Sequence, residues 1–77
     1  MLESEIRVRT INEKIGLMQI ALTLPCDVDI KNGTKIVDAK SELGVLEINT
    51  ITNHPKIIIH SDVEDYLELF DEWLVRK

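Results

Sequence analysis

Apolar and polar residues recur with two different periods along the 77-residue chain, and these periods predict strands and helices. Residues 6–10 read Ile-Arg-Val-Arg-Thr, a single alternation typical of a strand with one buried face. From residue 11 to about residue 22, apolar residues recur every three or four positions, which predicts an amphipathic helix. The apolar side chains of this helix are Ile11, Ile15, Leu17, Met18, Ala21 and Leu22.

The ends of this predicted helix carry start and stop signals. Thr10 or Asn12 is suited to cap its start. Pro25 restricts the residue before it, so we expect the helix to end at or before Leu24. Gly16 weakens the helix by about 1 kcal/mol relative to alanine. A close approach of another backbone segment would explain a glycine there.

A β-hairpin is predicted in the middle of the chain. Val28 and Ile30 alternate with charged residues and lead to Asn32-Gly33, a dipeptide that tolerates the positive φ angles of tight hairpin turns. Residues 35–38 return as the partner strand. Ser41 is then a good N-cap for a short helix that runs to about Asn49.

The last third of the chain predicts a loop, a strand and a helix. Asn53 and Pro55 mark the loop, and residues 57–59 are three isoleucines, typical of a central strand. Ser61 is followed three residues later by Glu64, which is the pattern of a capping box. An apolar stripe then predicts a helix that contains all three aromatic residues of the chain, which we expect in the core. The stripe consists of Val63, Tyr66, Leu67, Phe70, Trp73 and Leu74.

Together these elements predict an α+β fold. Their order is strand, helix, two hairpin strands, short helix, strand, helix, which suggests a four-stranded antiparallel sheet with three helices on one face. The length allows one domain over residues 1–77.

Composition narrows the function classes. The formal net charge is −5, which argues against binding to nucleic acid or to an anionic membrane. The start of the chain has no signal-peptide pattern, and no apolar stretch is long enough to span a membrane. Cys26 is the only cysteine, which fits a reducing compartment, so we expect a cytoplasmic protein.

The residue types that carry metal or catalytic chemistry are sparse. Cys26, His54 and His60 are the possible soft metal ligands, and none is paired at a metal-binding spacing. No nucleophile–base constellation is visible in the sequence. We therefore expect no metal, no cofactor and no enzymatic activity.

One segment resembles a known family. After the Asn32-Gly33 turn, the chain reads Lys40-Ser41-Glu42-Leu43-Gly44-Val45, which is similar to the segment of HPr that runs from a hairpin into the second helix. HPr is the histidine-containing phosphocarrier of the bacterial sugar phosphotransferase system. The resemblance implies the HPr-like open-faced β-sandwich with the order βαββαβα.

The chain departs from HPr at the phosphate-carrying loop. The HPr loop reads Gly-Leu-His-Ala-Arg-Pro just before the first helix. Matching its Gly-Leu to Gly16-Leu17 places Met18 at the histidine position and Ile20 at the arginine position. Counting back from Ser41 instead deletes most of the loop, so that the first strand runs almost directly into the helix. Both alignments lack the histidine, and neither a thioether nor an alkyl chain replaces an imidazole nucleophile.

The resemblance also assigns roles to residues around the second helix. In HPr of many Gram-positive bacteria, the serine that matches Ser41 is a regulatory phosphorylation site; the simpler interpretation is that Ser41 only caps the helix. Glu42 replaces an apolar residue of the HPr docking patch and would repel a phosphate. Lys40, Leu43 and Leu46 are candidates for protein contact, although the two leucines fit the core equally well.

Three functions follow as hypotheses. The first is an HPr-like module that does not transfer phosphate through a histidine and that binds a protein, either a phosphotransferase-system component or a regulator linked to it. The second is a phosphoacceptor at Ser41 through an HPr kinase. The third is a small-ligand-binding α+β domain unrelated to phosphotransfer. His54 and His60 are interpreted as surface histidines, since nothing in the sequence places a cation beside them.

Overall fold

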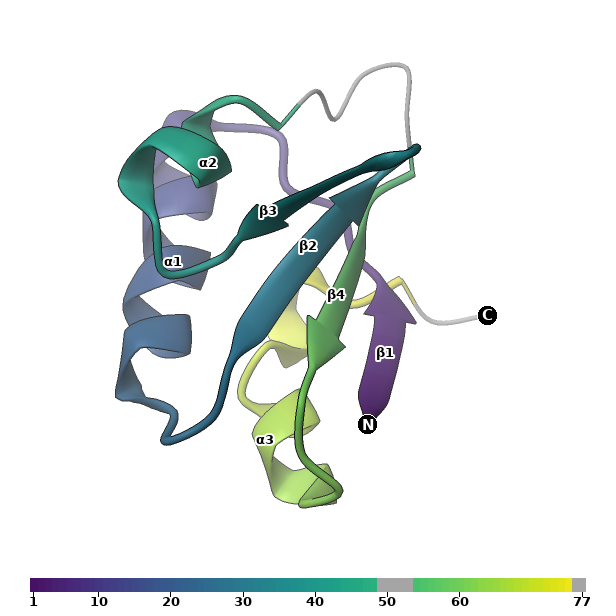
Figure 1. Ribbon diagram of the computed structural model, residues 1–77. Helices are drawn as coiled ribbons and strands as arrows, with labels where there is room; N and C mark the ends of the chain where they lie inside the picture. The colour runs from purple at the N-terminus through teal and green to yellow at the C-terminus, as the bar shows by residue number, and fades with distance from the viewer. Residues whose placement is uncertain (49–53, 76–77) are drawn as a thin grey trace.

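The computed structural model describes residues 1–48 and 54–75, which form one four-stranded sheet with helices packed against it (Figure 1). A 3₁₀ turn over Asp71–Trp73 follows the last helix. The elements are β1 (Leu2–Glu5), α1 (Ile11–Thr23), β2 (Val28–Asn32), β3 (Lys35–Asp38), α2 (Glu42–Leu46), β4 (Lys56–Ile59) and α3 (Glu64–Glu68).

The sheet has the order β1-β4-β2-β3, and every neighbouring pair is antiparallel. The three helices lie on one face of the sheet, as Figure 1 shows. The predicted order of elements and the α+β class are therefore confirmed.

The core lies between the sheet and the helices. β4 is central, as its three isoleucines predict, and pairs with β2 so that Ile57 lies opposite Ile30 and Ile59 opposite Val28. All four of these side chains are fully buried. They pack with buried residues of the helices and loops: Ile6, Val8, Leu17, Ala21, Leu24, Ala39, Val45, Ile48, Phe70 and Trp73.

The central hairpin forms between the predicted strands, but its turn lies one residue later than the predicted Asn32-Gly33. Asn32 pairs with Lys35, so Gly33 and Thr34 are the two loop residues. Gly33 has φ 67°, and a glycine at the first loop position is what a type II′ turn requires.

The predicted position of the first strand is wrong. β1 spans Leu2–Glu5, and residues 7–10 form no ladder. The N–H of Ile6 still donates to the carbonyl of Pro55 at 2.9 Å, but proline has no N–H to return a bond. Ile6 and Val8 are buried. The alternation therefore predicted the burial of these side chains correctly, but it did not predict which residues pair with a neighbouring strand.

The first helix has the predicted start and end, but its buried face differs from the apolar stripe. Leu17 and Ala21 are buried, whereas Ile11 and Leu22 are exposed. At Gly16 the close neighbour is the indole of Trp73 rather than a backbone segment, since an added Cβ would lie 3.2 Å from its Cζ2.

The second helix also begins where predicted. Ser41 is its N-cap and accepts a bond from the N–H of Gly44. Gly44 lies against β3, where an added Cβ would be 3.2 Å from the Cβ of Val37. The helix ends at Leu46 with Glu47 as its C-cap, so it is shorter than the predicted run to about Asn49. Asn49 itself and the predicted loop residue Asn53 lie outside the described residues.

The C-terminal helix is shorter than predicted. α3 ends at Glu68, and the backbone at Phe70 (φ −98°, ψ 12°) separates it from the 3₁₀ turn. The predicted capping box is also wrong. Ser61 accepts instead from the N–H of Val63, two residues on, so the bond closes a local turn before the helix. Phe70 and Trp73 are buried, which confirms them as core residues.

Candidate functional site

The HPr resemblance directs attention to the residues just before α1, and Thr10 is the last of them. Thr10 has extended backbone angles and is the N-cap. Its hydroxyl accepts from the N–H of Glu13 at 3.1 Å, and the carboxylate of Glu13 accepts from the N–H of Thr10 at 3.2 Å. This capping box follows the pattern Thr-x-x-Glu, a signal that the sequence contains but that the predictions did not use.

The carboxylate of Glu13 therefore occupies the positive end of α1. Its Oε1 also accepts from the N–H of Arg9 at 3.3 Å and from the hydroxyl of Thr10 at 3.3 Å. A helix N-terminus favours an anion because its first N–H groups lack helical partners. An internal carboxylate already supplies that anion.

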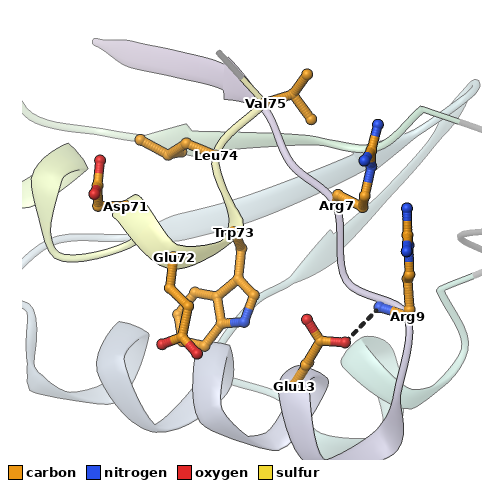
Figure 2. A pocket seen from close by; sticks show the side chains of 8 residues that line it. All are labelled: Arg7, Arg9, Glu13, Asp71, Glu72, Trp73, Leu74 and Val75. Carbon is orange, nitrogen blue, oxygen red and sulfur yellow. Dashed lines mark hydrogen bonds between the residues drawn. The ribbon is translucent and has the colours of Figure 1, made fainter.

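A cavity of about 590 Å³ lies beside this helix start (Figure 2). Its walls come from the segment after β1, from Glu13, and from the C-terminal segment. The N–H of Arg7 donates to the carbonyl of Trp73 at 2.7 Å, which joins the two segments. The lining residues are Arg7, Arg9, Glu13, Asp71, Glu72, Trp73, Leu74 and Val75.

The chemistry of this cavity is mixed. Two guanidinium groups, from Arg7 and Arg9, make no ion pair within the described residues. The indole N–H of Trp73 is buried and has no hydrogen-bond partner there. Glu13 and Glu72 bring opposing negative charge to the same walls. The lining includes no serine, cysteine, threonine or histidine that could act as a nucleophile.

The other residues singled out from the sequence lie at α2. Ser41 is partly buried, and its Oγ lies 3.5 Å from the N–H that it accepts, a long bond. The ammonium group of Lys40 donates to the carbonyl of Leu24 at 2.9 Å. Lys40 thereby ties the start of α2 to the end of α1.

The two leucines of α2 are not core residues. Leu43 is 77% exposed and Leu46 is 39% exposed. α1 and α2 pack against each other, and Ile11 on α1 is also 63% exposed. Sequence reasoning missed Ile11 as a surface residue, because the spacing of apolar residues does not tell which side of a stripe faces the sheet.

Neither histidine lies at the start of α1. The Nδ1 of His54 is 3.5 Å from Glu5, and the Nε2 of His60 is 2.8 Å from Asp29. Among the described residues neither imidazole is paired with an arginine.

The alignment that placed Met18 at the histidine position does not fit the structure, since Met18 and Ile20 lie in the middle of α1. The alternative, with the loop largely deleted, is also inaccurate. Residues 6–10 connect β1 to α1, and Thr10 stands immediately before the helix.

The described residues offer neither a metal site nor a membrane-spanning helix. No group of three or more His, Cys, Asp or Glu side chains in residues 1–48 and 54–75 is placed to hold a metal ion. Within the same residues, every helix is too short or too polar to cross a bilayer.

Comparison with solved structures identifies the fold as HPr-like. The crystal structure of HPr-C-His from Thermoanaerobacter tengcongensis is similar with a TM-score of 0.77 and 18% identity, over 94% of this chain and 89% of that one. The phosphocarrier protein HPr from Bacillus anthracis str. Ames gives a TM-score of 0.71 and 22% identity, over 96% of both chains. No protein-family model and no curated protein matches the sequence. The resemblance inferred from the α2 segment is thus confirmed for the fold.

Proposed function

We propose that this chain is an HPr-like module that carries no phosphate on a histidine and that acts by binding a protein of the sugar phosphotransferase system or a regulator linked to it. The observation that carries the proposal is the start of α1, where Thr10 and Glu13 bond to each other. An HPr-type carrier needs an imidazole nucleophile there, and an unfilled helix end to accept the phosphoryl charge.

Charge and geometry at this position oppose phosphoryl transfer. A threonine hydroxyl is a weak nucleophile unless a base takes its proton. Here the hydroxyl of Thr10 donates to the Glu13 carboxylate, whose same oxygen also accepts from two N–H groups at the helix start. A phosphoryl group arriving at the helix end would meet the negative charge of Glu13. The scaffold would then retain the shape of the carrier without its reaction.

Protein binding is supported by the exposed apolar residues on the two packed helices. Leu43 and Ile11 expose 77% and 63% of their surface, and with Leu46 they define what we call the α1–α2 surface. Contiguous exposed apolar side chains mark interaction sites, and these three residues lie on helices that pack against each other. The HPr resemblance offers Lys40, Leu43 and Leu46 as contact candidates, and Ile11 is added here because of its exposure.

An NMR titration of the ¹⁵N-labelled chain with purified proteins of the sugar phosphotransferase system tests this function. We expect shifts of Ile11, Leu43 and Leu46, and loss of binding in the variant Leu43→Glu. The matched control is Ile36→Glu, because Ile36 is 60% exposed but lies on β3. Binding that is lost equally in both variants, or shifts confined to other surfaces, would contradict the proposal.

Phosphorylation of Ser41 is a second candidate. The 3.5 Å separation of its hydroxyl from the N–H of Gly44 means that modification would break only a weak cap bond. The exposed Glu42 next to it opposes a dianionic phosphate. Mass spectrometry after treatment with an HPr kinase decides the matter, since an unmodified Ser41 removes this candidate.

A further inference from the structure

A second hollow lies between α3 and the edge strand β1, and it shares Leu74 with the cavity beside α1. It has a volume of about 360 Å³, within the range of protein ligand pockets. β1 is an outer strand of the sheet, and α3 packs against it (Figure 1). The hollow, which we call the α3–β1 hollow, is lined by Leu2, Ser4, Glu64, Leu67, Glu68 and Leu74.

The α3–β1 hollow combines an apolar floor with a negative rim. Leu2, Leu67 and Leu74 are partly buried and pack against the core. Glu64 and Glu68 are exposed and lie four residues apart on α3, which places their carboxylates on the same side of the helix. Neither carboxylate has an ion pair within the described residues.

The surrounding charge selects the occupant. Residues 61–75 contain six of the 14 acidic residues and no lysine or arginine. All six are exposed. The α-amino group of Met1 pairs with Asp62, and Asp71 has an interaction partner of its own. Four acids remain without an ion pair within the described residues, so a cationic partner would find uncompensated charge at Glu64, Asp65, Glu68 and Glu72. The six acids are Asp62, Glu64, Asp65, Glu68, Asp71 and Glu72.

We propose that the α3–β1 hollow docks a basic segment of a partner protein, with an arginine side chain laid into it. The methylene groups of arginine would pack on Leu2 and Leu67, while the guanidinium lies between Glu64 and Glu68. Arginine suits such a site because its stem is apolar and its planar head donates to two carboxylates. This surface is separate from the α1–α2 surface, so the proposal does not depend on the proposed function.

The probe is an acetylated and amidated pentapeptide with a central arginine between two leucines. It is titrated into the ¹⁵N-labelled full chain, with a peptide that has citrulline in place of arginine as the uncharged control. We expect shifts of Leu2, Ser4, Glu64 and Glu68, and binding that weakens as salt is added. Equal binding of the citrulline peptide would overturn the proposal. So would shifts on other surfaces, or equal binding of spermidine at the same ionic strength.

Two variants separate the hollow from general acidity. Glu64→Gln with Glu68→Gln should weaken binding about two- to thirty-fold, because two partly exposed ion pairs are lost. Asp65→Asn removes an exposed acid from the same helix without touching the lining, and it should leave the affinity within about twofold. Equal weakening in both cases would show diffuse attraction and contradict a defined site.

Discussion

At the scale of single residues, Thr10 and Glu13 define the start of α1, and the proposed function rests on this pair. Each of the two residues bonds to the backbone of the other, so two N–H groups of the first turn are satisfied within the chain. The same pair places a carboxylate at the positive end of α1.

Removing this cap should lower stability measurably. We expect Thr10→Ala to reduce the free energy of unfolding by about 0.5–2 kcal/mol, the usual contribution of an N-cap. Urea unfolding followed by circular dichroism measures the change. Thr34→Ala in the hairpin loop is the control and should change stability by less than about 0.5 kcal/mol. A Thr10→Ala variant as stable as the wild type would show that the bonds at the helix start contribute nothing.

Two glycines allow a comparison of close packing. An alanine at position 44 would meet the Cβ of Val37 at 3.2 Å and the carbonyl of Asp38 at 3.3 Å, both on β3. We expect Gly44→Ala to destabilise the fold by about 1–3 kcal/mol, as overpacking does. At Gly16 only the Trp73 ring is close, and the helix gains about 1 kcal/mol from alanine. Gly16→Ala should therefore cost less than Gly44→Ala in the same thermal denaturation series, and the reverse order would contradict this packing.

At the scale of elements, the Lys35–Glu47 ion pair joins β3 to the C-cap of α2, with 2.9 Å between Nζ and Oε2. The hydrogen bond and the charge of Lys35 lower the pKa of Glu47 from its ordinary value. A carboxyl whose pKa is lower in the folded state stabilises the fold above its unfolded pKa, and this stabilisation is lost as the pH falls through the folded pKa.

The pH dependence of a variant tests this pair. Glu47→Gln should have a slightly lower melting temperature than the wild type at pH 7, and the difference should disappear at about pH 3. The difference is small because both groups are exposed. Glu42→Gln on the same helix is the control. A difference that persists in acid would show that charge is not its cause.

The elements that the sequence predicted best were those with local causes. The hairpin forms at the Asn32-Gly33 signal, with its loop one residue later at Gly33 and Thr34, and α1 ends as Pro25 requires. The errors arose at elements whose position and length depend on contacts with residues distant in the sequence. Strand β1 was placed too late because Ile6 and Val8 alternate in burial beyond the last rung of the ladder. The C-terminal helix was predicted too long because Phe70 and Trp73 extend its apolar stripe. Both side chains reach the core from a 3₁₀ turn as well as they would from an α-helix, so their spacing does not distinguish the two.

The candidate site was harder to predict than the fold. Ser41 as an N-cap was anticipated, since capping depends on a few neighbouring residues. The exposure of Leu43 and Ile11 was not, because it depends on how α2 packs beside α1. The cavity beside α1 is lined by Arg7 and Trp73, from segments more than sixty residues apart in the sequence. No residue spacing in the sequence predicts such a cavity.

At the scale of the whole molecule, the chain keeps an HPr-like shape at 18–22% identity to the two solved HPr structures. That shape depends on buried positions such as Ile57 and Ile30, which tolerate exchange among apolar residues. The proposed function separates this fold from the phosphotransfer chemistry of HPr, because a fold does not by itself imply a function.

The most direct test of this separation is a phosphorylation assay. The chain is incubated with phosphoenolpyruvate and the general enzyme that phosphorylates HPr, with authentic HPr in a parallel sample to show that the enzyme is active. We expect phosphate on the authentic carrier and none on this chain. Acid-labile phosphate on His54 or His60 would contradict the account.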